Sequence, residues 1–300
     1  MNPETNEHEP SAESRIELDA VHHEMCEEIS ISKWFQQQRV ALGDFPSWHE
    51  RNNEALERKR ELLENLVQQG TLPDASPETI WKRTQDDLDI TIEQRTRELW
   101  SEIPEHLSDI LGSVRARLQK WLPGWTAPKT TIHFGTFERA DFSIDGQNVY
   151  VDLVRLARND DPMSALEEGL THELTHRWMD ETLDEEPSTP YQRMERKLIG
   201  EGIAVFVSGQ SLEKHHKSLG RDYPKYRTAA IHDVRGLLDD PESVTDKKVN
   251  ALFQSLGKGY VAGEAIMLQA HERLGDAGLR EMIAGAREHP EPLAEEWKER

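Results

Sequence analysis

Strand-like sequence is confined to one short block near the middle of the chain, and long segments with helical patterning flank that block on both sides. Within the block, the runs 130–134, 141–144 and 147–153 are rich in β-branched and aromatic residues, as β-strands are. Asp145-Gly146, between the second and third runs, is a dipeptide typical of a two-residue hairpin turn. We therefore expect a small antiparallel sheet within an α+β fold that is predominantly helical.

The same patterns divide the chain into three regions. The first 30 residues hold nine acidic residues and one basic residue, and we expect a disordered acidic tail over residues 1–14. Residues 15–125 carry apolar residues at three- and four-residue spacings, which predicts an N-terminal helical region. Its helices are predicted at 48–69, 76–100 and 105–122. Residues 126–300 combine the strand block with further helices and predict a second, α+β part.

The composition argues against several classes of protein. With 36 Lys and Arg against 57 Asp and Glu, the net charge is −21, whereas a nucleic-acid partner requires a surplus of basic residues. Cys26 is the only cysteine, which excludes an internal disulfide and a cysteine-rich metal site. The longest strictly apolar run, 203–207, is far shorter than the roughly 20 residues of a membrane span. The N-terminus lacks a basic start followed by an apolar stretch, so we expect a cytoplasmic protein with no membrane partner.

Two histidines and a glutamate mark the helix that we expect to begin near Asp161. Residues 171–176 read Thr-His-Glu-Leu-Thr-His, an HExxH motif. Because four residues advance a helix by about 400°, His172 and His176 lie on the same face and can bind one zinc ion. Glu173 lies about 100° around the helix, close enough to take a proton from a water that the metal activates.

A catalytic zinc site usually needs a third protein ligand and keeps a fourth position open. We favour Glu201, which lies in the sequence Gly-Glu-Gly-Ile-Ala on a helix expected to begin near residues 188–190. The two glycines indicate that this helix closely approaches the HExxH helix. Asp180 is a weaker candidate, because His172, His176 and Asp180 rise about 12 Å along one helix and cannot share one small ion.

HExxH followed by EGxA resembles the gluzincin metallopeptidases, the clan of thermolysin and aminopeptidase N. The likeness is greatest to a family of predicted zinc-dependent proteases of bacteria and archaea. It covers residues 130–285 and consists of a strand, the HExxH motif, an EGIA segment and a Tyr-x-x-Gly segment, here at 149–153, 172–176, 201–204 and 260–263. The resemblance implies a zincin-like domain over residues 126–300, with a short sheet, the HExxH helix and a helical C-terminal subdomain.

The resemblance also implies the chemistry. One zinc ion per chain would be held by His172, His176 and Glu201, and Glu173 would act as general base in hydrolysing a peptide bond of a peptide or protein substrate. Where thermolysin has an aspartate that orients a zinc-bound histidine, this chain has Val205. A carboxylate with that role would therefore have to come from another position. Both exopeptidase and endopeptidase action stay open.

Peptide hydrolysis further needs a donor for the developing oxyanion and a surface that holds the substrate. Tyr260 is the first candidate for the donor, because its hydroxyl can donate and its segment matches the family. His232 and His271 are the alternatives. The strand at residues 149–153 could hold an extended peptide by strand addition if its edge is free.

Two other classes of function compete with a peptidase. Di-iron carboxylate proteins use pairs of Glu-x-x-His, and this chain has Glu173/His176 and Glu213/His216 at that spacing. The lysines around Glu213 are typical of a solvated surface, however, and this interpretation leaves His172 without a role. The other class is a non-catalytic metal-binding or interaction protein, in which the N-terminal helices serve as scaffold or offer a partner-binding surface.

Two further histidine clusters have weaker support as sites. His22, His23 and Cys26 could bind a metal ion, but they lie beside the acidic tail and lack a fourth ligand. His215 and His216 lie between two lysines, which predicts a solvated helix end.

Overall fold

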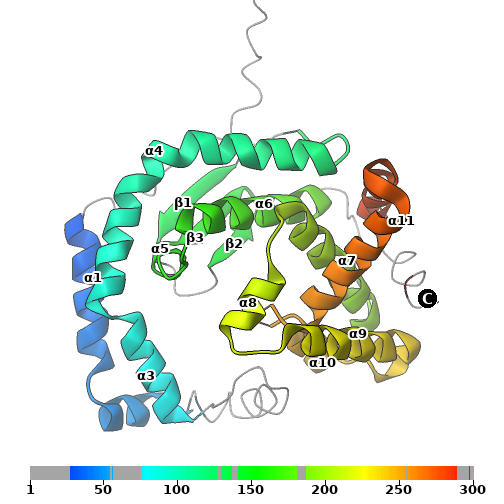
Figure 1. Cartoon of the computed structure of the whole chain (residues 1–300). Coiled ribbons are helices and arrows are strands. Elements are labelled where there is room, and N and C mark those ends of the chain that lie inside the picture. Colours follow the sequence, from blue (N-terminus) through cyan, green and yellow to red (C-terminus); the bar gives the residue numbers. More distant parts are fainter. Residues whose placement is uncertain are drawn as a thin grey trace, which may run out of the picture.

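The computed structural model describes residues 28–54, 56, 76–126, 130–136, 141–180, 187–254, 256–288 and 297, with side chains from residue 31 onward. Helices surround a small three-stranded sheet (Figure 1), which confirms a predominantly helical α+β fold. In chain order the elements are α1 (Glu28–Leu42), α3 (Pro77–Asp87), α4 (Ile90–Trp121), β1 (Thr131–Gly135), β2 (Phe142–Asp145), β3 (Asn148–Asp152), α5 (Leu153–Leu156), α6 (Pro162–Asp180), α7 (Pro190–Ser208), α8 (Leu212–Ser218), α9 (Tyr223–Asp239), a 3-10 turn (Pro241–Ser243), α10 (Asp246–Leu252) and α11 (Lys258–Glu288).

Several predictions fall outside the described residues. The predicted tail over residues 1–14 lies there, as do His22, His23 and Cys26. Of the helix predicted over 48–69, residues 48–54 and 56 are described, and all of them are helical. Among the helices that the structure does describe, none combines the length and the apolar character needed to cross a membrane.

The sheet is mixed, not antiparallel throughout as predicted. β2 and β3 form the predicted hairpin, with Gly146 at a positive φ of 55° in its turn. β1 pairs with β3 in parallel, and the strand order is β1-β3-β2. The register gives the reason. Gly135 at the end of β1 pairs with Asp152, and Phe142 at the start of β2 pairs with Val151, so β3 lies between the two other strands.

This strand order corrects a second expectation. The strand predicted at residues 149–153 is β3, the central strand, which has a partner on each side and therefore no free edge for an added peptide. β2 is an edge strand, since β3 is the one described strand that pairs with it. One face of the sheet is packed into the core through Ile132, Phe134, Val149 and Val151.

α6, which carries the HExxH motif, begins where the sequence predicts. Asp161 caps it by accepting a hydrogen bond from the main-chain amide of Ser164 at 3.1 Å. The helix also touches the sheet directly, because a Cβ atom on Gly169 would lie 2.3 Å from the ring of Phe142 in β2. Its predicted apolar stripe is fully buried and consists of Leu166, Leu170 and Leu174.

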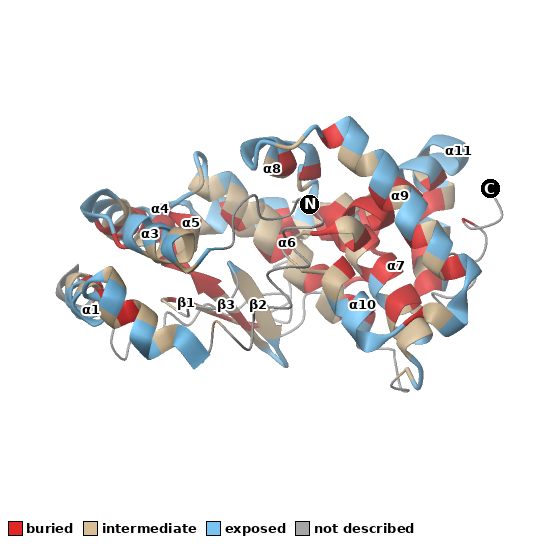
Figure 2. Cartoon of the chain, turned by 90° about the horizontal axis from the view of Figure 1, so that it is seen from below, coloured by how far each residue is buried: buried red, intermediate tan, exposed pale blue. Residues whose placement is uncertain are grey.

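α7 is buried along most of its length and packs against α6 and α11 (Figure 2). Thr189 caps it at the predicted position. The prediction that both of its glycines approach the HExxH helix is wrong for Gly202, because a Cβ atom there would lie 2.6 Å from the carbonyl oxygen of Gly263 in α11. At Gly200 a Cβ atom would lie an ordinary 4.0 Å from Met179 of α6. The closest contact of α7 is therefore with α11.

α4 is one continuous helix, although the sequence predicts separate helices on either side of residues 101–104. The helix runs through Pro104, which removes one helical hydrogen bond. Ile103 and its neighbours along the same side are buried in the core, and this packing offsets the lost bond. The break lies earlier, at Asp89, whose carboxylate accepts a hydrogen bond from the amide of Thr91 at 2.6 Å.

A second hydrophobic cluster joins the N-terminal helices to the rest of the chain. It contains Ile31, Phe35, Leu42, Trp48, Leu88 and Val154. Val154 belongs to α5 and follows the sheet in the sequence, while Trp100 of α4 packs against both this cluster and the main core. The division predicted at residue 125 thus crosses two sets of packing contacts.

Candidate metal centre

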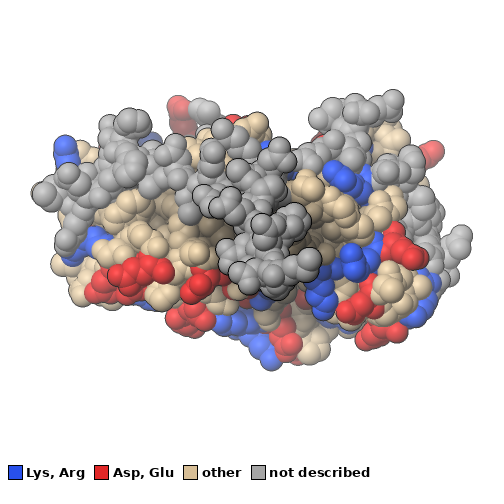
Figure 3. Space-filling view, turned by 90° about the horizontal axis from the view of Figure 1, so that it is seen from above, with Lys and Arg blue, Asp and Glu red and all other residues tan. Residues whose placement is uncertain are grey.

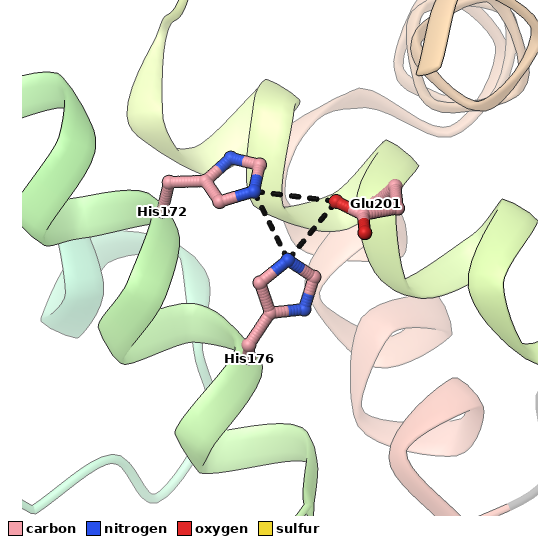
Figure 4. A group of neighbouring side chains, drawn as sticks. All are labelled: His172, His176 and Glu201. Carbon is pink, nitrogen blue, oxygen red and sulfur yellow. Dashed lines mark hydrogen bonds and ion pairs between the residues drawn. The ribbon is translucent and has the colours of Figure 1, made fainter. Parts of the chain in front are cut away.

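Three side chains from two helices meet in one place (Figure 4). His172 and His176 lie one turn apart on α6, and Glu201 comes from α7. The Nε2 atom of His176 lies 3.0 Å from Nε2 of His172 and 3.0 Å from Oε2 of Glu201, while His172 Nε2 and Glu201 Oε2 are 3.2 Å apart. Among the described residues, these three form the group that could hold a metal ion.

The dimensions of this ligand triangle fit a zinc ion. Zinc binds imidazole nitrogens and carboxylate oxygens at about 2.0–2.2 Å in a tetrahedron, which places the ligand atoms about 3.3 Å apart. The observed separations of 3.0–3.2 Å are close to that value. Two histidines and one glutamate are also a donor set that zinc uses with its fourth position open to water.

Burial and mutual charge set the protonation of the triangle. Burial alone would raise the pKa of the Glu201 carboxyl, but hydrogen bonds with His172 and His176 outweigh it and hold that pKa well below its usual range. Burial lowers the pKa of His176, whereas its hydrogen bond with Glu201 and the charges of Glu201, Glu173 and Asp180 raise it overall. Glu201 is therefore ionised, which is the form that binds a cation.

Glu173 lies beside the triangle without being one of its corners. Burial raises the pKa of its carboxyl, the nearby His172 and His176 lower it, and the charge of Glu201 raises it, with a net upward shift. The predicted general base thus lies close to the candidate ligands, where its carboxyl group can serve a water bound at the site.

Tyr260 reaches the same place from α11. Its ring centroid lies 6.4 Å from that of His172, with the ring planes 25° apart. Its hydroxyl is within hydrogen-bonding reach of the Glu201 carboxylate, and burial together with the charge of Glu201 raises the pKa of Tyr260, so the hydroxyl keeps its proton. The structure brings together Tyr260 and the three predicted ligands.

The two histidines differ in their outer surroundings. Asp180, one turn beyond His176, is exposed and lies outside the triangle, and its charge raises the pKa of His176. Asp180 is thus a neighbour of a candidate ligand, which agrees with the geometric argument against its being a ligand itself. Nδ1 of His172 is buried without a hydrogen-bond partner among the described residues.

The two alternative oxyanion donors, His232 and His271, lie outside the ligand triangle. His232 is 87 % exposed on α9. His271 places Nε2 2.7 Å from Oδ1 of Asp276, and its ring packs against Trp121 and Phe206. None of these contacts belongs to the ligand triangle, so Tyr260 is the better-placed candidate.

The second Glu-x-x-His pair lies outside the ligand triangle. Glu213 is 53 % exposed and forms an ion pair with a lysine one turn further on. His216 is fully buried, so the prediction of a solvated helix end is wrong for this residue. The Arg221 guanidinium lies 2.7 Å from Nδ1 of His216, and the His216 ring packs on Tyr223 and Tyr226. Burial and the Arg221 charge lower the pKa of His216 to about 4, and the arginine occupies one of its two ring nitrogens.

Sequence reasoning misses two residues next to the Tyr260 segment. The Tyr223 hydroxyl of α9 donates a hydrogen bond to Oε2 of Glu264 in α11 at 2.7 Å. Glu264 follows Tyr260 by four residues and so lies on the same face of α11, which is a weak sequence signal. No local pattern pairs it with Tyr223.

Comparisons with known proteins assign no family. Neither a family model, nor a curated protein, nor a solved structure matches the chain. The likeness to gluzincins therefore depends on the motif residues and on the geometry of the ligand triangle.

Proposed function

We propose that the protein is a zinc-dependent peptidase that hydrolyses peptide bonds with water as the nucleophile. One observation carries the proposal, the convergence of His172, His176 and Glu201 with the carboxyl group of Glu173 beside them. A non-catalytic metal site has no need of a further carboxyl group beside its ligands. A hydrolytic site does need such a group.

The side chains of the site would divide the work as follows. His172, His176 and Glu201 would hold a zinc ion, which would supply Lewis acidity that lowers the pKa of a water and polarises the substrate carbonyl. Glu173 accepts the proton that the attacking water loses and returns it to the leaving nitrogen, so no covalent intermediate with the protein forms. During the reaction the Tyr260 hydroxyl would turn from Glu201 and donate its hydrogen bond to the oxyanion that develops on the substrate.

An extended substrate could pair with the edge strand β2. The Phe142 ring of β2 lies against Gly169 of α6, three residues before His172, so the strand runs close to the motif. Main-chain hydrogen bonds to an edge strand hold a peptide with little demand on its sequence. β2 takes the place of the central strand β3, which has no free edge.

The test compares two glutamates of α6. Glu173→Gln is expected to keep zinc and lose at least a hundredfold in turnover of a peptide library, since general base catalysis contributes about 10²–10⁴-fold. Glu168→Gln is the matched control, because burial also raises the pKa of Glu168 but its charged neighbours are Arg117, Lys214 and Glu167, none of them in the ligand triangle. Undiminished turnover in Glu173→Gln would refute the mechanism.

Metal analysis distinguishes the peptidase from its rivals. We expect about one zinc per chain in protein supplied with both zinc and iron, as three protein ligands and a water require. Two irons per chain would instead support a di-iron carboxylate protein. Zinc binding with no cleavage of any peptide would support a non-catalytic metal-binding protein.

A further inference from the structure

Tyr260 lies in the first turn of α11, where a helix has the fewest hydrogen bonds of its own. The chain turns sharply just before it. Leu256 has a positive φ of 53°, and a Cβ atom on Gly257 would lie 2.8 Å from the carbonyl oxygens of both Leu252 and Gln254. The position of Tyr260 is therefore set by contacts between α11 and neighbouring helices.

α7 determines how closely α11 can lie. A Cβ atom on Gly202 would be 2.6 Å from the Gly263 carbonyl oxygen, and one on Gly263 would be 2.5 Å from the Leu198 carbonyl oxygen. These are main-chain atoms, which cannot rotate away. Glu201 and Tyr260 flank this contact, one and three residues from the two glycines in the sequence. The distance between the two helices is thus fixed close to the metal centre.

A close helix contact fixes a separation, but it leaves α11 free to rotate about its own axis. Such a rotation would carry the Tyr260 hydroxyl away from Glu201. Glu264 lies on the same face as Tyr260, one turn further along. Its Oε2 accepts the hydrogen bond from Tyr223 at 2.7 Å, and Tyr223 is only 7 % exposed on α9. A buried partner on a third helix therefore resists the rotation.

We propose that Tyr223 and Glu264 are positioning residues that hold the Tyr260 hydroxyl at Glu201, and that Tyr260 in turn orients the carboxylate of this candidate ligand. The inference rests on the metal centre of the proposed function, but it does not require that the protein cleave peptides. Outer partners of metal ligands fix the orientation of the ligands, and their loss typically lowers metal affinity about 10–100-fold.

A spectroscopic test needs neither metal nor substrate. The chain has five tyrosines, so ¹³Cζ labelling of tyrosine gives few resonances, which single Tyr→Phe variants assign. In full-length Tyr223→Phe we expect the Tyr260 resonance to move, because its hydroxyl leaves Glu201. In Tyr226→Phe we expect it to stay, since Tyr226 lies on the same helix and no hydrogen bond joins its hydroxyl to another described residue. A Tyr260 resonance that Tyr223→Phe leaves in place would overturn the proposal.

Zinc affinity, measured by competition with a chelator, tests whether Tyr223 acts on the metal centre through Tyr260. Tyr260→Phe is expected to lower the affinity about 10–100-fold, and Tyr223→Phe to lower it less. Added to Tyr260→Phe, the Tyr223→Phe change should have no further effect, because it acts through Tyr260. An equal loss from Tyr223→Phe in both backgrounds would contradict the proposal.

Two substitutions of Glu264 separate positioning from general damage to the fold. Glu264→Gln keeps an oxygen that accepts the Tyr223 hydroxyl, so its zinc affinity should stay close to that of the unmodified chain. Glu264→Leu loses the acceptor, so its zinc affinity should fall as much as that of Tyr223→Phe. A larger loss of affinity in Glu264→Gln than in Glu264→Leu would refute the role of this hydrogen bond. If these effects occur in a chain that cleaves no peptide, the proposed function fails and this inference stands.

Discussion

Glu201 is the one residue of the ligand triangle that comes from α7, since both histidines come from α6. The site therefore bridges two helices through Glu201. In Glu201→Ala only the two imidazoles remain, and we expect the zinc content after gel filtration to fall from about one per chain to well below that. Elemental mass spectrometry measures the content. His232→Ala is the control. His232 is 87 % exposed and lies outside the triangle, so this variant should keep its zinc. An unchanged zinc content in Glu201→Ala would place the third ligand elsewhere.

The residues of the triangle can be predicted from sequence because their arrangement is mostly local. His172 and His176 follow from the four-residue helical spacing, and Glu201 from a second helix that can supply the carboxylate. The hydrogen bond from Tyr223 to Glu264 spans 41 positions and joins two helices. No periodicity relates residues at such a separation, so a single sequence carries no sign of it.

Among the helices, the packing of α7 on α11 is the contact least tolerant of added volume. Gly202→Ala places a methyl group where a main-chain carbonyl lies 2.6 Å away, so the helices must separate. We expect the free energy of unfolding in urea to fall by about 1–3 kcal/mol, as overpacking does in other cores. Gly236→Ala on α9 is the control, because nothing lies within 4 Å of its Cβ position and it should gain up to about 1 kcal/mol. Equal stability of the two variants would contradict the close contact.

The continuity of α4 leads to a second prediction about an element. If the helix is regular through Pro104, then Pro104→Ala restores a main-chain hydrogen bond. The free energy of unfolding should rise by part of the roughly 3 kcal/mol that proline costs in a helix interior. Thermal unfolding against Glu105→Ala, an exposed neighbour, measures the gain. A loss of stability in Pro104→Ala would show that α4 needs the proline at this place.

The residues at which helices and turns begin are predicted better from sequence than are the elements that pack against each other. Asp161 and Thr189 are capping residues next to a proline, and both mark helix starts correctly. The hairpin at Gly146 is equally local. The order β1-β3-β2 and the pairing of α7 with α11 depend on which elements meet in the folded chain, and local patterns do not encode that.

The whole chain carries a net charge of −21, but its acidic side chains do not form one continuous patch on the face shown in Figure 3. Basic and acidic side chains are interspersed there. Several charges are paired across elements, as Arg193 is with Asp246 and Lys120 with Asp276. Fields of mixed sign steer a substrate weakly over long distances. We therefore expect peptides to be selected by contacts near the metal centre and not by overall charge.

The described N-terminal helices and the metal centre are linked through α4 and α5, and this linkage predicts how zinc stabilises the molecule. Trp100 packs against both hydrophobic clusters, and Val154 follows the sheet yet lies in the N-terminal cluster. If the two parts unfold together, zinc bound at the triangle protects both of them. At a hundredfold excess over its dissociation constant, zinc should add about 2.7 kcal/mol. Hydrogen exchange followed by mass spectrometry should then slow in α1 as well as in α7.

In Glu201→Ala the same zinc concentration should change neither helix, which controls for metal bound elsewhere. Protection confined to α6, α7 and α11 would contradict cooperative unfolding. It would instead favour two independently stable units divided near residue 125. Because Leu99, Ile103 and Ile110 of α4 lie in the same hydrophobic core as the sheet and α6, separating the chain near residue 125 would expose apolar surface on both parts. That exposure is the physical reason to expect one cooperative unit.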